Sequence, residues 1–387
     1  MNLRVPALLC AALLAFAGCT DNAPSGTGSA GDARKLSVTS SDTACTLSAT
    51  SAPSGPLTFA VTNTGAAVTE FYLLASDGLR IIAEVENIGP GLTRELVLSA
   101  STGSYFSACK PGMAGAGIRA AFQVTDSGVA VGPTGDDAAL VAAANEAYGN
   151  YVGDQVDQLL ARTQEFVAAY SGGQDDQARA LYPQARVHWE RVETVAESFG
   201  DLDPKMDARE ADLTDGQKWT GWHRIEKDLW PARAKDYTPL TATQRKTFAD
   251  DLLANTEVLH ERVEALTYTV DGIANGAKGL LDEVATGKVT GEEEYWSRTD
   301  LWDFQANVDG ARVAWEGLRD LLKRKNPTLD AQIETRFTGL QKLLDQYRTG
   351  DGFVTYDKLT KPQVKDLSDA VNALSEPLSK MAGAVLS

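Results

Sequence analysis

The chain has few residues of the kinds that build common catalytic and redox sites. Its 387 residues include only three histidines, four cysteines and four methionines. It contains no His-Glu-x-x-His sequence, so zincin chemistry has no support, and no serine or cysteine stands near a histidine in a known nucleophile pattern. It also lacks the Gly-x-x-x-x-Gly-Lys-Ser/Thr sequence of a phosphate-binding loop, and we interpret residues 275–279 as a turn into a helix.

Positive charge is in short supply as well. The chain has 36 Lys and Arg residues against 53 Asp and Glu residues, which gives a net charge of −17 at pH 7. Such a chain is not expected to bind nucleic acid, and it attracts cations. An acidic surface is also ordinary for a soluble secreted protein, so the charge alone does not establish a cation site.

Long hydrophobic runs are absent after the N-terminus. A basic start is followed by an apolar run over residues 5–16 and then by Ala-Gly-Cys19. This pattern indicates a secretory signal peptide over residues 1–18 rather than a membrane span. The sequence resembles a bacterial lipobox, so we expect Cys19 to be lipidated and to anchor the protein to the membrane outside the cytoplasm, at the cell surface or in the periplasm. The alternative is secretion with an unmodified Cys19.

Cysteine usage follows from that location. Cleavage removes Cys10 and lipidation blocks Cys19, which leaves Cys45 and Cys109 as a pair. In an oxidising compartment a disulfide is the default for such a pair. Residues 19–34 are mostly small and polar, and we expect them to form a flexible tether.

The rest of the chain divides into two halves with different periodicities. Residues 35–126 alternate with a period of two, as at Leu57, Phe59 and Val61, which predicts an all-β sandwich. Residues 127–137 are rich in Gly, Pro and Asp and form a linker. Residues 138–387 show apolar residues at intervals of three and four, which predicts an all-α bundle. The helices are expected over residues 138–170, 175–199, 219–230, 241–269, 301–322, 329–347 and 362–386.

One helical segment of the second half carries a candidate metal site. His223 and Glu226 are three residues apart and therefore share a face of the helix predicted over residues 219–230. Imidazole and carboxylate donors suit divalent metals such as iron. An exposed His–Glu pair on an amphipathic helix is the alternative.

Carboxylates gather just upstream of that segment. Glu190, Glu193 and Glu197 fall on one face of the helix predicted over residues 175–199, and the loop after it adds Asp203. Carboxylates of this kind can hold a cation inside a helical bundle. The alternative is a solvated face whose charges form surface ion pairs with neighbouring arginines.

These segments match a known family. The chain resembles the EfeO-type iron-uptake lipoproteins, in which a cupredoxin-like domain precedes an imelysin-like helical domain. Gly221-x-His223-x-x-Glu226 is similar to the metal-associated motif of the imelysin family. The resemblance implies that His223 and Glu226 are ligands and makes Glu190, Glu193 and Asp203 the best candidates to complete the metal's coordination. The segments that carry it are residues 185–193, 196–205, 221–230, 279–284, 290–294 and 368–378.

The resemblance of the first half to cupredoxins is weaker and departs from the family at one decisive point. A blue-copper site needs two histidines and a Cys thiolate with an axial Met, and this half contains no histidine. Glu70, Cys45, Cys109 and Met113 could instead form a different site, for copper or ferric iron. The Cys45–Cys109 disulfide is the reading we prefer.

The resemblance also implies a function. It implies a non-enzymatic protein that captures ferrous or ferric iron outside the cell and passes it to an EfeU-type membrane permease, with an EfeB-type haem peroxidase as a further partner. Zinc is another metal that the sites could accept. One alternative is a metal-dependent peptidase or hydrolase of the imelysin type, which would need an open coordination position and a general base. Another is a surface adhesin whose metal site is incidental.

Overall fold

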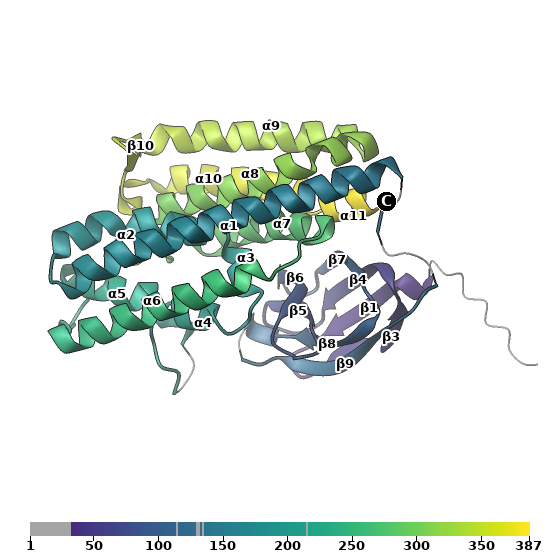
Figure 1. The fold of residues 1–387 in the computed structure, drawn as a ribbon, viewed down its shortest axis with the longest axis horizontal. Coiled ribbons are helices and arrows are strands. Elements are labelled where there is room, and N and C mark those ends of the chain that lie inside the picture. The colour runs from purple at the N-terminus through teal and green to yellow at the C-terminus, as the bar shows by residue number, and fades with distance from the viewer. Residues whose placement is uncertain (1–31, 114, 129–131, 134, 214–215) are drawn as a thin grey trace, which may run out of the picture.

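The computed structural model describes residues 32–113, 115–128, 132–133, 135–213 and 216–387. The predicted signal peptide, Cys19 and most of the predicted tether lie outside these residues. The all-β region comes first and the helical region second, which confirms the fold class expected from the sequence. Figure 1 shows the β-sandwich lying against one end of the long helical bundle.

The β-sandwich consists of two sheets that face each other. One has the strand order β2-β1-β4-β7 and the other the order β3-β9-β8-β5-β6. The pairs β1–β4 and β3–β9 are parallel and the remaining pairs of both sheets are antiparallel. The strands are β1 (Lys35–Ser40), β2 (Cys45–Leu47), β3 (Ser51–Pro53), β4 (Gly55–Asn63), β5 (Thr69–Leu74), β6 (Ile81–Ile88), β7 (Thr93–Ala100), β8 (Gly103–Cys109) and β9 (Ile118–Thr125).

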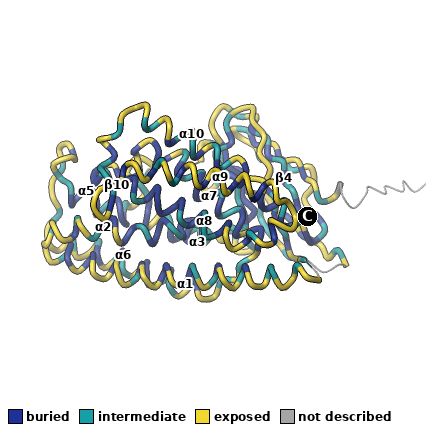
Figure 2. The backbone as a smooth tube through the Cα atoms, turned by 90° about the horizontal axis from the view of Figure 1, so that it is seen from above, coloured by how far each residue is buried: buried dark blue, intermediate teal, exposed yellow. Residues whose placement is uncertain are grey.

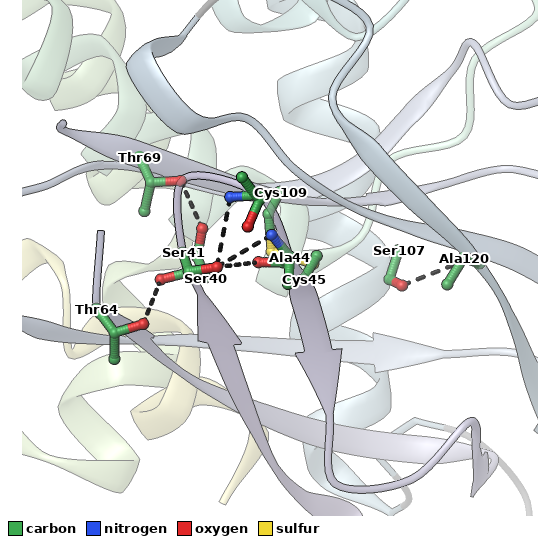
Figure 3. The surroundings of a disulfide bond; sticks show 10 residues. Ser40, Ser41, Ala44, Cys45, Thr64, Thr69, Ser107, Cys109 and Ala120 are labelled. Atoms are coloured by element: carbon green, nitrogen blue, oxygen red, sulfur yellow. Dashed lines mark hydrogen bonds between the residues drawn. A yellow bond between two sulfur atoms is a disulfide. The ribbon is translucent and has the colours of Figure 1, made fainter. Parts of the chain in front are cut away.

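The interior of the sandwich is apolar. Leu57, Phe59 and Val61 alternate along β4 and are fully buried, as their spacing predicts, because successive side chains of a strand point to opposite faces. Phe71 and Phe122 from the opposite sheet pack against Phe59. A disulfide joins Cys45 of β2 to Cys109 of β8 and so links the two sheets (Figure 3).

The helical domain is a bundle built around one continuous apolar core (Figure 2). Capping boxes begin two of its helices, at Thr241 with Gln244 and at Thr360 with Gln363. None of the helices in the described part of the chain has the length and apolar run that crossing a bilayer requires. The helices are α1 (Asp136–Ser171), α2 (Asp175–Glu190), α3 (Glu193–Glu197), α4 (Asp203–Met206), α5 (Trp222–Leu229), α6 (Ala242–Glu264), α7 (Val270–Thr286), α8 (Asp300–Lys325), α9 (Pro327–Leu344), α10 (Lys361–Leu378) and α11 (Met381–Leu386).

Three local expectations were wrong, and one of them is the single helix over residues 362–386, which the structure divides into α10 and α11 at residues 379–380. Residues 275–279 do not form a turn, because they lie inside α7. The two glycines there face α3, where a Cβ on Gly276 or Gly279 would stand 3.2 or 3.0 Å from side-chain atoms of Thr194. Glycine therefore serves close helix packing at this place. The helix expected over residues 175–199 is also broken, because Val192 leaves the helical conformation with φ −125° and ψ 14°.

The two domains meet through α7 and the turn after α3. Asp271 accepts a hydrogen bond from the backbone N–H of Ser99 at 2.8 Å, and Asn275 donates to the carbonyl of Val97 at 2.9 Å. The backbone N–H of Ile81 donates to the carbonyl of Ser198 at 2.8 Å. A cavity of about 310 Å³ lies between the domains beside these contacts.

Candidate metal centre

Three carboxylates of the centre come from the end of α2 and from the short elements that follow it. Glu190 is the last residue of α2, Glu193 begins α3, and Asp207 directly follows α4. The break at Val192 turns the chain between the first two, so both side chains can enter the interior. All three are buried, with at most 8% of each residue exposed.

The histidine comes from α5, and its position depends on a glycine. Gly221 precedes α5 with φ +84°, and a Cβ there would lie 2.1 Å from the carbonyl oxygen of Met206. Only glycine tolerates both conditions, so it lets α5 begin directly against the end of α4 that carries Asp207. His223 and Glu226 then enter the interior, where both are fully buried.

The last group of carboxylates comes from the segment before α8 and from α8 itself. Glu293 and Glu294 lie in that segment, and Asp303 lies in the first turn of α8. All three are buried. The centre thus combines four segments that are far apart in the sequence.

The candidate ligand atoms form overlapping sets. One oxygen from each of Glu190, Glu193, Asp207 and Glu293 can be chosen so that all four lie within 4.8 Å of one another. His223 extends this set, because its Nε2 lies 3.3 Å from Asp207 Oδ1 and 3.3 Å from Glu293 Oε1. A further group joins His223 to Glu226 and Glu294.

Glu226 holds the histidine in place. Its Oε1 accepts hydrogen bonds from the backbone N–H groups of Trp296 at 2.8 Å and Ser297 at 2.6 Å. Its Oε2 lies 3.3 Å from Nδ1 of His223. This is the arrangement of a carboxylate that orients a metal-binding histidine through the ring nitrogen that faces away from the metal.

Two side-chain cations are buried among these carboxylates. The Arg186 guanidinium forms ion pairs with five of them: Glu190, Asp207, Glu293, Glu294 and Asp303. Nζ of Lys288 lies 2.9 and 2.8 Å from the two oxygens of Glu193 and 3.0 Å from Oε2 of Glu190. The cluster is therefore partly neutralised by the chain itself.

The pKa values reflect this crowding. Burial raises the pKa values of Glu190 and Glu193, and repulsion between the two carboxylates raises that of Glu193 further. Burial also acts on Glu293, but Lys288 and His223 outweigh it and lower the pKa of Glu293 to about 2. Burial and Arg186 oppose the protonation of His223, yet its contacts with Asp207, Glu226 and Glu293 raise its pKa well above the ordinary value.

Several buried polar atoms of the centre have no hydrogen-bond partner. These are Nε2 of His223, Oε2 of Glu190 and both carboxylate oxygens of Asp303. The Lys288 ammonium is close to Glu190 Oε2 but is not placed to donate a hydrogen bond to it. Buried polar atoms of this kind require compensation, and hard oxygen donors with one imidazole suit a divalent or trivalent metal such as iron.

The structure brings four of the five predicted ligands of the helical domain together and leaves the fifth outside the candidate ligand groups. His223, Glu226, Glu190 and Glu193 lie together in the centre, whereas Asp203 does not belong to any of the ligand groups. Asp203 sits in the first turn of α4 and is half-buried, and burial together with repulsion from Asp207 raises its pKa to about 7. Asp207, four residues later, belongs to two of those groups.

The alternative site in the β-sandwich lacks its sulfur ligands. Cys45 and Cys109 are joined to each other, so neither offers a thiolate. Glu70 is paired with Lys110 at 3.1 Å, and Met113 is exposed at the surface. The four residues therefore do not form a metal site in this structure.

Sequence reasoning missed Glu293, Glu294 and Lys288. Residues 290–294 matched the family pattern, but their acidic run resembles an ordinary surface loop. A single lysine such as Lys288 has no sequence pattern that would indicate a place in a metal site. Only the fold shows that these side chains turn inward.

Known proteins resemble this chain over most of its length. The sequence profile of imelysin, peptidase M75, matches residues 144–381. The chain is 36% identical to "Iron uptake system component EfeO" of Yersinia pestis, over 92% of each chain. It is 44% identical to an "Efem/EfeO family lipoprotein" of Staphylococcus haemolyticus (strain JCSC1435), over 64% of this chain and 85% of that protein. A second lipoprotein with the same description, from Staphylococcus aureus (strain MRSA252), is 43% identical over 62% of this chain and 84% of that protein. The chain therefore belongs to the imelysin family and is an EfeO-type protein.

Proposed function

We propose that this protein is the extracytoplasmic iron-binding component of an EfeUOB-type uptake system. In this proposal, lipidated Cys19 anchors the chain and residues 19–34 form the tether. The sandwich over residues 35–126 and the bundle over residues 138–387 are joined by the linker at residues 127–137. The relatives named for iron uptake support the role, and the acidic charge of the chain favours cation capture.

One observation supports the proposal most strongly. Four buried carboxylates, Glu190, Glu193, Asp207 and Glu293, converge from separate segments on one point, and Nε2 of His223 faces two of them. We propose these five groups as the metal ligands, with Glu226 as the group that orients His223. Iron is the intended cargo, and zinc and copper are ions that the same donors accept.

A pair of neighbouring aspartates tests this ligand set. In calorimetric titrations of the mature chain with ferrous iron under anaerobic conditions, we expect Asp207→Asn to weaken binding at least 100-fold. Asp203→Asn is the matched control, because it changes the same side chain four residues away, and we expect less than a threefold effect. Equal losses in the two variants would refute the ligand set. A wild-type chain that binds neither ferrous iron nor ferric citrate would refute the carrier function itself.

Delivery would follow from the same chemistry. Carboxylate and imidazole ligands lose metal as they take up protons, so iron affinity should fall on acidification. We propose that an EfeU-type permease receives the iron and that an EfeB-type haem peroxidase acts with it. Capture of the permease by the immobilised mature chain would support this transfer. Iron uptake by the permease in the absence of the mature chain would contradict it.

The name of the matching family includes the word peptidase, so a metal-dependent peptidase is the alternative function to test. A hydrolytic metal needs an open position for water and a general base. Metal-dependent cleavage of a peptide panel, abolished by Glu226→Ala, would make the protein an enzyme. We expect no cleavage.

A further inference from the structure

Lys288 stands where a bound metal would compete with it. Its side chain is 1% exposed, and its ammonium contacts Glu190 and Glu193, two of the four carboxylates proposed as ligands. We propose that Lys288 is an exchangeable counterion, whose ammonium group occupies the empty site and moves away when the metal enters. This inference rests on the proposed iron-carrier function and identifies a residue that controls which cations the site accepts.

Arg186 is less suited to such an exchange. It lies within α2, and its planar guanidinium is held by five carboxylates at once. Lys288 instead begins the short 3-10 turn Lys288–Thr290, between Gly287 and Gly291. A lysine carries a compact charge on a flexible four-carbon stem, whereas an arginine at a site with several partners is fixed by its geometry. Arg186 is thus a permanent part of the centre, and Lys288 is the cation free to move.

The structure also offers a destination for the displaced ammonium. Glu193, Glu197 and Glu283 form another group whose oxygens can lie within 4.8 Å of one another. Glu193 belongs to both groups, so a short movement of Nζ would take it from one to the other. Among the described residues, neither Glu197 nor Glu283 has a lysine, arginine or histidine within ion-pair distance. Both line the cavity between the domains, which gives the side chain room.

The exchange has a consequence for selectivity. A monovalent ion would replace one positive charge by another and would gain little, whereas a divalent or trivalent ion brings more charge than the ammonium it displaces. Sodium and potassium should therefore compete poorly for the site. When the metal leaves, the return of Lys288 compensates the carboxylates again, so the empty carrier does not keep an uncompensated cluster.

The test compares Lys288 with Lys278, a lysine of the preceding helix α7. The probe is Zn²⁺, which does not change its oxidation state, titrated into the mature chain at low and high sodium chloride with potassium as a second salt. We expect Lys288→Met to bind Zn²⁺ at least tenfold more tightly than the wild type at low salt. Its affinity should then fall with added sodium more steeply than that of the wild type.

Lys278→Met is the control variant. Lys278 lies on α7, lines the same cavity and pairs with Asp282, but it does not contact the four ligands. We expect its Zn²⁺ affinity to stay within threefold of the wild type. Unchanged or weaker binding by Lys288→Met would overturn the proposal and would mean that the ammonium supports the bound metal. Absence of Zn²⁺ and iron binding by the wild type would instead refute the carrier function.

If Lys288→Met does not fold, the variant Glu283→Gln and a crystal structure of the zinc-loaded wild-type chain test the same proposal. Glu283→Gln removes part of the destination and should weaken Zn²⁺ binding at least threefold in the wild-type background. In the crystal structure of the zinc-loaded wild-type chain, Nζ of Lys288 should have left Glu190 and should contact Glu197 or Glu283. An ammonium that still contacts both Glu190 and Glu193 beside the metal would overturn the exchange.

Discussion

The two domains both have apolar cores, but only the helical domain also encloses a large cluster of charged side chains. The interior of the β-sandwich is formed mainly by apolar side chains from two sheets, with one disulfide between them. The interior of the helical domain surrounds a cluster of carboxylates with a buried arginine, lysine and histidine. Apolar burial is favourable by itself, whereas buried charges are tolerated only while each is compensated.

This difference predicts which substitutions should destabilise each domain. The sandwich should respond to changes in its covalent link and little to metal. The helical centre should respond strongly to the loss of a single charge, because each partner of that charge is then left uncompensated in the interior.

The largest effect is expected at Arg186. We expect Arg186→Met to lower the free energy of unfolding of the metal-free chain by about 3 to 5 kcal/mol, because it removes the partner of several buried carboxylates. Urea denaturation measures the loss. Lys110→Met is the matched change in the sandwich, where the ammonium is partly exposed, forms an ion pair with Glu70 and donates a hydrogen bond to Tyr72. It should cost about 1 kcal/mol, and similar losses in the two variants would break the comparison.

Removal of the disulfide tests how far the stability of the β-sandwich depends on its covalent link. We expect Cys45→Ser/Cys109→Ser to destabilise the sandwich by about 2 to 4 kcal/mol, because a link across 64 residues of chain restricts the unfolded state. Calorimetry should show this as a lower unfolding temperature for the β-sandwich. Iron affinity should not change, and a large loss of affinity would show that the sandwich contributes to the metal site.

Glu226 sharpens the comparison within the helical centre. We expect Glu226→Gln to weaken ferrous iron binding about 10- to 100-fold, because the role proposed for Glu226 is to orient His223 rather than to touch the metal. The glutamine carbonyl can still accept from the amides of Trp296 and Ser297, so the fold should be kept. A complete loss of binding in a folded variant would make Glu226 a direct ligand.

The smallest effect concerns pH and the boundary between the domains. Burial, followed by repulsion from Glu70, raises the pKa of Glu84 to about 8. The folded form then holds a proton that the unfolded chain gives up near pH 4.5, so stability should fall as the pH rises from about 4.5 to 8. Because Glu84 is only half-buried, we expect Glu84→Gln to raise stability at pH 8.5 by about 1 kcal/mol and to have little effect at pH 4. A gain of equal size at both values would contradict this.

The sequence predicted what depends on local pattern. Leu57, Phe59 and Val61 show their alternation directly, and the fixed spacing of Gly221, His223 and Glu226 carried the family resemblance. The choice between Asp203 and Asp207 could not be made, because Asp203 begins the short helix α4 and Asp207 directly follows it, and only the approach of α5 decides which one faces the centre.

The sequence could not predict which residues far apart in the chain meet in the fold, and the reason is physical. Arg186 and Glu293 are 107 residues apart, and no periodicity links a helix to a loop at that distance. Likewise, the glycines at 276 and 279 favour a turn when considered locally, whereas packing against Thr194 makes them part of a helix. Tertiary context overrides local preference at both places.

The two backbone amides that hold Glu226 have a consequence for the history of the family. They tie the Gly-x-His-x-x-Glu helix to a loop 70 residues further along the chain. A substitution that changed the path of residues 295–297 would misplace His223 without touching the motif. The motif and the loop should therefore vary together among relatives, and a chain that keeps one while losing the other should have given up the metal.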